Sequence, residues 1–311
     1  MKIGFIKPTY PGEKRVALLP QHIDNFENEI VMEYGFGANL DIDDKAYENK
    51  GCVFDTRKSI FANCEVIFCL KLLQPEDYDN LQKDQMIIGW THPTGSGTDF
   101  FQKVAMPKEL KIVDLDNIYP ALFCKDKKIS IPFIPKNFIW KNSFYAGWAS
   151  VEHALMSMGM IPNSSTKVAV LANGSVSQGA YNTISKYHVD IRMFYRKTMH
   201  EFYDTLSDYD IIINGIEVDG TVKHILSKDD LKRVKKGCLI IDSAADAGNA
   251  IEGTHYTTIA NPIYKENDLF FYEVNNAPSI YFRQTSWEIS KSFSHWVYKK
   301  DVKQFMELLS L

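Results

Sequence analysis

Apolar and polar positions alternate along the first part of the chain in a regular series of strand-like and helix-like segments. The short apolar segments that predict buried strands are Lys2–Ile6, Ile30–Tyr34, Glu65–Lys71, Gln85–Trp90 and Lys111–Leu115. The amphipathic segments that predict helices between them are Pro20–Glu27, Asp44–Lys50, Thr56–Ala62 and Gly97–Ala105. Such alternation predicts a parallel sheet covered by helices on both faces.

A second series of the same kind begins at Lys167. A proline-bearing stretch at 129–142 and a long helical pattern at about 143–158 separate it from the first series. Its predicted strands are Lys167–Ala172, Asp190–Phe194, Asp210–Asn214, Cys238–Asp242, Thr257–Ala260 and Leu269–Glu273. Its predicted helices are Ser177–Lys186, His200–Ser207, Lys228–Lys235 and Trp287–Tyr298. Two series indicate two domains, which a chain of 311 residues can accommodate.

The first strand of the second series enters a turn of small residues. The sequence Lys167-Val-Ala-Val-Leu-Ala-Asn-Gly-Ser-Val-Ser-Gln-Gly-Ala180 indicates the strand, turn and helix that open a dinucleotide-binding unit. Small side chains let the backbone approach a pyrophosphate, and the helix N-terminus offers it amide donors. We therefore predict cofactor contacts at Ala172, Asn173, Gly174, Ser175, Val176 and Ser177. The alternative is an ordinary buried strand that enters a helix through a lone glycine.

Two cations, Arg196 and Lys197, follow the second strand of this series. A site for NAD usually has Asp or Glu at this position, where the carboxylate binds the ribose 2′-hydroxyl. Two positive charges indicate a 2′-phosphate instead, and Ser175 can assist them. The expected cofactor is therefore NADPH/NADP.

These patterns predict an α/β fold of two Rossmann-like domains with parallel sheets and an active-site cleft between the domains. We expect residues 141–278 to form the NADP(H)-binding domain. Residues 1–140 would form the substrate (catalytic) domain, completed by a C-terminal segment, 279–311, that crosses back to it.

Composition narrows the classes of partner. The chain is 45% hydrophobic and 24% charged with a net charge of −4, which is typical of a globular protein and gives no reason to expect nucleic acid or an anionic membrane. No apolar run approaches the roughly 18 residues of a membrane span. The five cysteines include no CxxC pair. We therefore expect no metal cluster, and a reducing, cytoplasmic location.

Four polar residues at strand ends or in loops are candidates for chemistry: Arg15, Lys71, His92 and Asp246. Arg15 can bind a small carboxylate, or it can be a surface arginine. Lys71 can stabilise a carbonyl oxygen as negative charge develops, or extend its ammonium to water. His92 can exchange a proton near neutral pH, or be structural. Asp246 can contact the nicotinamide ribose or the substrate, or cap the next segment.

These residues, taken in order, make the chain resemble the alanine dehydrogenase and transhydrogenase family, together with the lysine-forming saccharopine dehydrogenases. The matching segments run nearly from end to end: Arg15-Val-Ala-Leu-Leu-Pro20, Lys71-x-x-Gln-Pro-Glu-Asp-Tyr78, His92, the turn at 171–180, Ala245-Asp246-Ala-Gly248-x-x-Ile-Glu252, Asn276-Ala-Pro278 and Arg283-Gln-Thr-Ser286. The resemblance adds Asn276 and Arg283 to the expected cofactor-binding residues.

Within this family the chain is most similar to members that form carboxyethylornithine. That similarity lies in Gly89-Trp-Thr-His-Pro93, Asn142-Ser-Phe-Tyr-Ala-Gly147, Tyr195-Arg-Lys-Thr-Met199 and Ala244-Ala-Asp-Ala-Gly248. It implies NADPH-dependent reductive condensation of pyruvate with the side-chain amine of L-ornithine or L-lysine, in a homo-oligomer (a tetramer or a dimer). The chain departs from alanine dehydrogenase because it is shorter, lacks the acidic residue after the second strand, and has Ala172 and Ser177 where glycines are expected.

The implied roles are specific. Arg15 would bind the pyruvate carboxylate, Lys71 would stabilise its keto oxygen, and His92 would transfer protons, with Asp246 as a further catalytic residue. Two alternatives remain within the same enzyme class: alanine dehydrogenase, which uses ammonia, and a saccharopine-type enzyme, which uses 2-oxoglutarate and lysine. A third alternative is a non-catalytic module that senses NADP(H).

Overall fold

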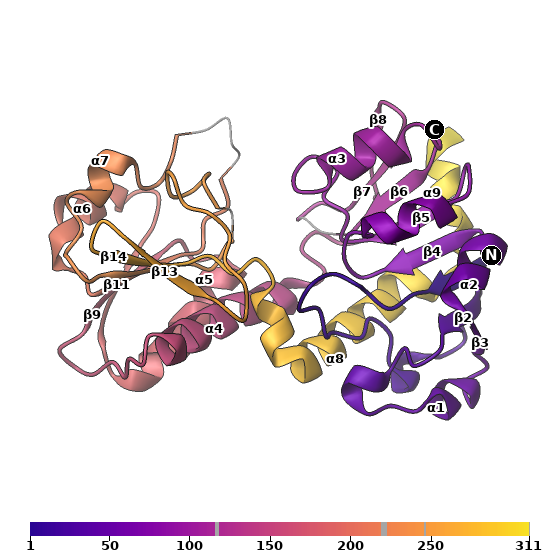
Figure 1. The fold of residues 1–311 in the computed structure, drawn as a ribbon, viewed down its shortest axis with the longest axis horizontal. Coiled ribbons are helices and arrows are strands. Elements are labelled where there is room, and N and C mark those ends of the chain that lie inside the picture. Colours follow the sequence, from indigo (N-terminus) through magenta and orange to yellow (C-terminus); the bar gives the residue numbers. More distant parts are fainter. Residues whose placement is uncertain (116–117, 219–222, 246, 311) are drawn as a thin grey trace. The chain divides into compact units, whose positions relative to one another are not determined.

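The computed structural model of the chain describes residues 1–115, 118–218, 223–245 and 247–310. The chain folds into two compact units (Figure 1). The first unit combines Met1–Ile139 with Phe282–Leu311, and the second is Trp140–Tyr281. No helix in the described ranges is both long enough and apolar enough to cross a membrane.

The first unit contains an eight-stranded sheet in the order β3-β2-β1-β4-β5-β6-β7-β8. Its strands are β1 (Lys2–Phe5), β2 (Glu29–Glu33), β3 (Val53–Asp55), β4 (Val66–Cys69), β5 (Met86–Gly89), β6 (Lys111–Asp114), β7 (Ala121–Cys124) and β8 (Lys127–Ser130). The first six are parallel, whereas β7 and β8 run antiparallel to their neighbours.

Helices cover both faces of this sheet because successive strand residues point in opposite directions. Phe68 and Ile88 pack with Phe293 on one face, whereas Ile67 and Ile87 belong to the core on the other. The helices of this unit are α1 (Asp44–Glu48), α2 (Arg57–Asn63), α3 (Thr98–Phe100) continued by a π turn at Phe101–Ala105, α8 (Phe282–Phe293) continued by a π turn at Ser294–Tyr298, and α9 (Lys303–Glu307). Short 3₁₀ segments lie at Pro20–His22, Ala38–Leu40, Pro75–Asn80 and Leu308–Ser310.

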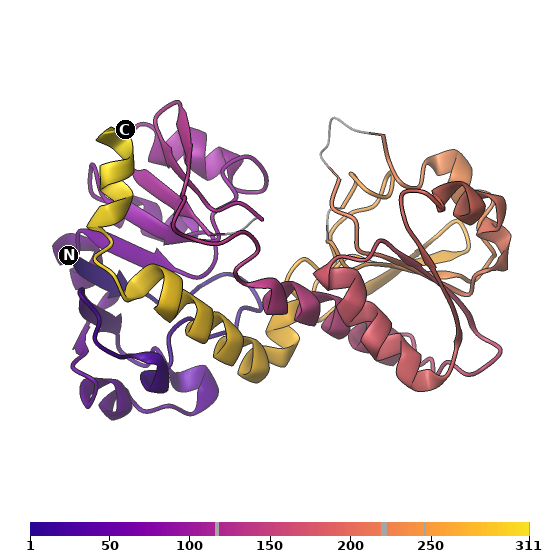
Figure 2. The ribbon, with the colours of Figure 1, turned by 180° about the vertical axis from the view of Figure 1, so that it is seen from behind.

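The C-terminal segment is part of the first unit (yellow in Figure 2). From α8 the chain follows one face of the sheet, where Phe293 and Tyr298 are completely buried. The side chain of Asn28 binds this segment from the other side, donating to the carbonyls of Tyr298 at 2.8 Å and Lys300 at 2.7 Å and accepting from the amide of Val302. The first thirty residues and the last thirty therefore share one core.

The second unit contains a six-stranded sheet in the order β10-β9-β11-β12-β14-β13. Its strands are β9 (Lys167–Leu171), β10 (Asp190–Phe194), β11 (Ile211–Asn214), β12 (Leu239–Asp242), β13 (Ile263–Glu266) and β14 (Leu269–Tyr272), and all are parallel except the edge strand β13. Its helices are α4 (Trp140–Ser157), α5 (Ser175–Ile184), α6 (Met199–Asp204) and α7 (Lys228–Leu231), with 3₁₀ segments at Ser185–Tyr187, Leu206–Asp208 and Ala277–Tyr281.

Helices α4 and α5 pack closely because each contributes a glycine to their contact. A Cβ atom on Gly147 would lie 1.8 Å from the Val176 carbonyl oxygen, and one on Gly179 would lie 1.8 Å from the Phe144 carbonyl oxygen. No side chain fits at either position without moving a helix backbone. This packing fixes α5, whose N-terminus follows the turn after β9.

Two predicted elements are wrong. The segment Pro20–Glu27 forms only a 3₁₀ turn over Pro20–His22, and Asn25 has a left-handed φ of 49° that no helix continues through. The segment Thr257–Ala260 makes one isolated bridge at Thr257, and the strand in this region is β13. The predicted parallel sheets also carry antiparallel strands toward one edge: β7 and the edge strand β8 in one unit, and the edge strand β13 in the other.

Candidate active site

Arg15 lies in the loop after β1 and is almost completely buried, with 2% of its surface exposed. Its Nε and Nη2 donate to the two carboxylate oxygens of Glu13 at 2.8 and 2.6 Å, and its backbone N–H donates to the same carboxylate at 2.8 Å. Burial alone would raise the pKa of Glu13, but Arg15 and Lys71 outweigh it and lower that pKa below its ordinary value. Arg15 is therefore a buried, positioned cation and not a surface arginine.

Lys71 lies just beyond the carboxyl end of β4, and its ammonium group lies near the same aromatic ring as Arg15. Its Nζ is 5.7 Å from the ring centre of Trp90 and 5.5 Å from that of Tyr10. The Arg15 guanidinium is 4.6 Å from the Trp90 ring centre. Two of the predicted substrate-binding residues thus meet on one aromatic side chain.

His92 lies in the loop after β5, two residues beyond Trp90, in a left-handed conformation with φ of 46°. The loop is held by hydrogen bonds to one buried carboxylate. Oδ1 of Asp114 accepts from the backbone N–H of Thr91 at 3.0 Å, from its hydroxyl at 3.2 Å, and from the N–H of His92 at 3.3 Å. The carbonyl of His92 accepts in turn from the amides of Gly95 and Gly97. The position of His92 along the sheet edge is therefore well defined.

In the second unit, the predicted phosphate turn joins β9 to α5. Ala172 has a left-handed φ of 71°, and its N–H donates to the Phe194 carbonyl of β10 at 2.8 Å. Among the residues that the structure describes, a Cβ on Gly174 would meet nothing within 4 Å, so the backbone there is open. Helix α5 begins at Ser175, and the first amides of a helix have no acceptor within it. These features fit a pyrophosphate at the turn.

Ser177 has a different role from the other residues of the turn. It is completely buried, and its hydroxyl donates to the Leu171 carbonyl at 2.7 Å. A Cβ on Gly215 would lie 2.2 Å from its Oγ. Ser177 therefore packs α5 against β9 and β11, which is the role of the third glycine in dinucleotide-binding turns.

Arg196 and Lys197 are exposed in a turn directly after β10. The Thr198 hydroxyl closes this turn by accepting from the Tyr195 N–H at 2.9 Å. Phe194 pairs with Leu171 across the sheet, so the turn of the basic pair lies at the same sheet edge as the phosphate turn. Neither cation forms an ion pair with another residue of the described ranges, while the nearby Glu201 is paired with Arg192.

The remaining predicted residues lie in three places. Asn276 is buried beyond β14, and its carbonyl accepts from the N–H of Ser279 at 3.0 Å. Arg283 belongs to α8 in the first unit, where it forms an ion pair with Asp41 at 2.5 Å. Asp246 lies outside the described residues.

Sequence reasoning missed five residues of the two units: Glu13, Trp90 and Asp114 in the first, and the buried pair of Asn214 and Asp242 in the second. Nδ2 of Asn214 donates to Oδ1 of Asp242 at 3.0 Å, at the carboxyl ends of adjacent strands β11 and β12. A polar residue at the end of an apolar strand was the available signal for Asp114, Asn214 and Asp242.

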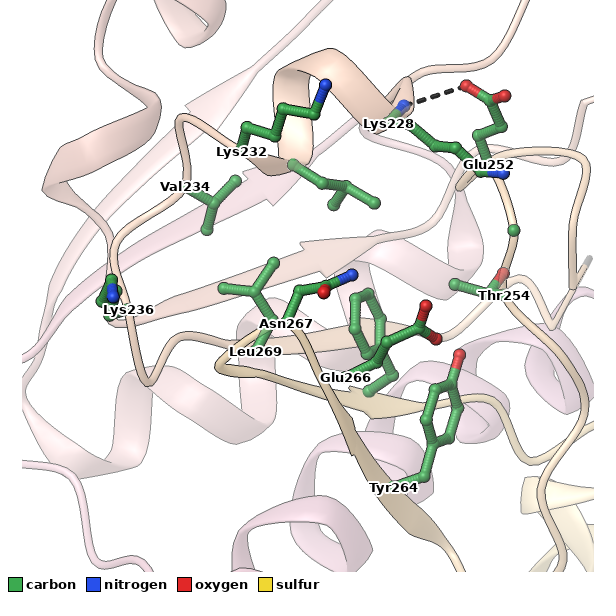
Figure 3. A pocket seen from close by; sticks show the side chains of 13 residues that line it. Lys228, Lys232, Val234, Lys236, Glu252, Thr254, Tyr264, Glu266, Asn267 and Leu269 are labelled. Atoms are coloured by element: carbon green, nitrogen blue, oxygen red, sulfur yellow. Dashed lines mark hydrogen bonds between the residues drawn. The ribbon is translucent and has the colours of Figure 1, made fainter.

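A groove of about 500 Å³ in the second unit lies apart from all these residues. It is bounded by α7, by the strand pair β13 and β14, and by residues 252–254 (Figure 3). Leu231, Leu269 and Phe271 give it apolar walls, and Lys228 and Lys232 lie at its rim. No predicted site residue lines this groove, so we do not assign it to the active site.

Comparisons with known proteins agree with the family resemblance that the sequence motifs indicate. The family models "Alanine dehydrogenase/PNT, N-terminal domain" and "Alanine dehydrogenase/PNT, C-terminal domain" match residues 4–120 and 146–310. An N(5)-(carboxyethyl)ornithine synthase from Clostridium botulinum is 52% identical over 310 residues, which cover 100% of this chain and 98% of that protein. One from Lactococcus lactis subsp. lactis is 51% identical over 307 residues, covering 99% and 98%. The resemblance inferred from the motifs is confirmed.

Solved structures show the same fold. An L-alanine dehydrogenase has a TM-score of 0.77 at 20% identity and covers 100% of this chain and 92% of its own. A transhydrogenase from Sinorhizobium meliloti has a TM-score of 0.73 at 15% identity, covering 99% and 95%. The predicted α/β fold of two Rossmann-like domains is therefore confirmed. The predicted cleft between the two domains stays a prediction.

Proposed function

This chain belongs to the alanine dehydrogenase/PNT family, and we propose that it condenses pyruvate reductively with the side-chain amine of L-ornithine or L-lysine. With ornithine the product would be N5-(1-carboxyethyl)ornithine. The chain is an enzyme of the oxidoreductase class, as its relatives indicate. The observation that carries the proposal is the meeting of Arg15 and Lys71 on Trp90, in a chain about half identical to carboxyethylornithine synthases over their full length.

We propose NADPH as the cofactor. The open backbone at Gly174 and the start of α5 at Ser175 fit its pyrophosphate. The exposed cations Arg196 and Lys197 fit its 2′-phosphate. Asn173, Val176, Asn276 and Arg283 stay candidate cofactor contacts. When bound, NADPH supplies the hydride that reduces the imine formed from the two substrates.

The residues of the first unit would prepare that imine. Arg15 would attract the pyruvate carboxylate as a fixed charge, since its Nε–Nη2 edge is engaged by Glu13. Lys71 would stabilise the keto oxygen while the neutral amine attacks the keto carbon. His92 would give a proton to the departing hydroxyl, so that water leaves the carbinolamine and a protonated imine remains, which needs only a hydride to become the secondary amine. Asp246 stays a catalytic candidate.

A three-way assay tests this proposal. Oxidation of NADPH is measured with pyruvate plus ornithine or lysine, with pyruvate plus ammonia, and with 2-oxoglutarate plus lysine, and each is repeated with NADH. We expect rapid oxidation in the first case and with NADPH. Preference for ammonia would make the protein an alanine dehydrogenase, and preference for 2-oxoglutarate a saccharopine-type enzyme. NADPH binding without turnover in any assay would indicate a sensor.

The proposal also covers the location and the oligomeric state of the protein. We propose a cytoplasmic homo-oligomer, a tetramer or a dimer, acting on small molecules. Size-exclusion chromatography with light scattering measures the oligomeric state, and a monomer at micromolar concentration would contradict this part.

A further inference from the structure

We propose that Trp90 is a positioning residue for the keto-acid half of the reaction, holding Arg15 and Lys71 at a fixed spacing through the face of its indole ring. The inference rests on the proposed function, because it assigns Arg15 and Lys71 to pyruvate. It goes beyond it by naming the side chain that sets their geometry and by predicting which kinetic parameter depends on that side chain.

The first argument is the contact geometry. The guanidinium carbon of Arg15 is 4.6 Å from the Trp90 ring centre, and Nζ of Lys71 is 5.7 Å from it. A cation within about 6 Å of an aromatic face is attracted by the ring quadrupole, most strongly for tryptophan. One ring thus attracts both cations, and the carboxylate of Glu13 also binds Arg15.

The second argument is that the ring itself cannot move far. Trp90 is 2% exposed, and Phe293 of α8 packs edge-on against it with 5.9 Å between ring centres. Its backbone N–H donates to the Leu70 carbonyl at 3.2 Å, one residue before Lys71. A Cβ on Gly89 would lie 1.8 Å from the Cys69 carbonyl oxygen, so the ends of β4 and β5 are held close. Ring and lysine are therefore positioned by the same two strand ends.

The third argument concerns what the indole does not do. Its Nε1 is buried and has no hydrogen-bond acceptor among the residues that the structure describes. Leaving a buried donor unsatisfied is unfavourable. The indole N–H of Trp90 therefore lowers the stability of the folded protein. The useful part of the side chain is its ring face, which both cations contact. A phenylalanine would keep such a face without the N–H.

The experiment compares Trp90→Phe, Trp90→Leu and a control, Phe305→Leu, in the whole chain. The control removes a completely buried ring of the same core, in α9, which packs against Phe133. Each cation–π contact corresponds to about twofold to thirtyfold in an equilibrium constant. We expect Trp90→Leu to raise KM for pyruvate at least ~10-fold while KM for NADPH changes less than about twofold, and Trp90→Phe to recover most of the loss.

The control separates positioning from stability. Phe305→Leu should lower Tm as Trp90→Leu does, yet leave KM for pyruvate nearly unchanged. Equal rises in KM for both leucine variants, or no rise for Trp90→Leu, would overturn the proposal.

A second measurement does not depend on activity and leaves Trp90 in place. Lysines of the wild-type protein are reductively methylated with ¹³C-formaldehyde, and the Lys71 signal is identified by its absence in Lys71→Arg. Ring currents of Trp90 and Tyr10 should displace this signal from those of exposed lysines. A Lys71 signal among the exposed ones would overturn the Trp90 proposal. Absence of NADPH oxidation with pyruvate and ornithine in the wild type would instead overturn the proposed function alone.

Discussion

Oδ1 of Asp114, at the end of β6, accepts a hydrogen bond from the backbone N–H of His92, at 3.3 Å in the loop after β5. The same oxygen binds both donors of Thr91. Because His92 has a left-handed φ of 46°, which is unfavourable for a non-glycine residue, this carboxylate stabilises a loop that would otherwise relax.

Asp114→Ala should therefore lower kcat about tenfold and destabilise the protein by ~1–3 kcal/mol, since buried amide donors lose their acceptor. Asp114→Asn keeps the Oδ1 acceptor and should be much closer to wild type. Turnover and urea unfolding of the two variants measure this. If the asparagine variant is as impaired as the alanine variant, the negative charge matters and not the acceptor.

His92→Ala should bind NADPH as the wild type does and lose about 10²–10⁴-fold in turnover, the usual contribution of a general acid–base. Fluorescence titration with NADPH and steady-state rates separate the two quantities. His200→Ala is the control, because that histidine is exposed in the other unit. Near-normal turnover of His92→Ala would exclude His92 as the proton donor.

The double variant Arg196→Ala, Lys197→Ala should weaken NADPH binding by roughly 10- to 100-fold, as expected for the loss of two charge-assisted phosphate contacts. Binding of NADH, which lacks the 2′-phosphate, should change little. Removing two other exposed lysines of the same unit, Lys232 and Lys236, is the control for net charge. Comparable losses for both cofactors would contradict the assignment.

Two glycines in the second unit should respond in opposite ways to alanine. Gly179→Ala should destabilise the protein by ~2 kcal/mol or more, since the new Cβ would lie 1.8 Å from the Phe144 carbonyl oxygen. Gly174→Ala should leave Tm unchanged, because its Cβ meets nothing and its φ of −68° suits alanine. It should nevertheless weaken NADPH binding, because the added methyl group occupies space proposed for the pyrophosphate. Thermal unfolding and cofactor titration distinguish the two.

Glu13 should make stability depend on acid pH. Its pKa in the folded protein lies below the ordinary value of 4.5, so the folded state favours the ionised form. The resulting stabilisation is complete above about pH 4.5 and is lost as pH falls through the lower folded pKa. Glu13→Gln removes the negative charge that binds the buried Arg15 and should cost ~3–5 kcal/mol at pH 7.

Unfolding free energies of the wild type and of Glu13→Gln, measured at pH 7 and again between pH 3 and 4, test this sign. The difference between the two proteins should shrink at the lower pH. A difference that stays constant would show that the pKa of Glu13 is not lowered by folding.

Much of the fold could be predicted from the short apolar strand segments and from the residues of the turns. The runs that became β1, β4, β5, β9, β11 and β12 are short and apolar because both faces of a parallel strand are buried. The edge strands gave no such signal. β8 has no fully buried residue, and β13 is half exposed, so their sequences resemble those of loops. Antiparallel edges with one solvated face were therefore missed.

Part of the candidate site could likewise be predicted from the sequence, and part could not. Arg15, Lys71 and His92 could be proposed because each follows a strand with chemistry of its own. The groups that fix them are visible only in three dimensions: Trp90 contacts Lys71 from the next strand, and Asp114 is 22 residues beyond His92. Local periodicity holds no information on such pairings between strands. Glu13 differs from these groups because it is close in sequence to the residue that it binds, only two positions from Arg15. A Glu-x-Arg spacing alone, however, does not predict a buried pair.

The return of residues 282–311 to the first unit affects how the protein is synthesised. The second unit is one continuous segment, so it can fold as soon as residue 281 has left the ribosome. The first unit cannot fold completely at that stage. Phe5 packs against Tyr298 and Phe68 against Phe293, and both of these partners are synthesised more than 220 residues later. During translation one face of the first sheet is thus exposed and prone to aggregation until the last thirty residues cover it. Truncation within α8 should therefore be far more damaging to the nascent protein than the small number of residues removed would indicate.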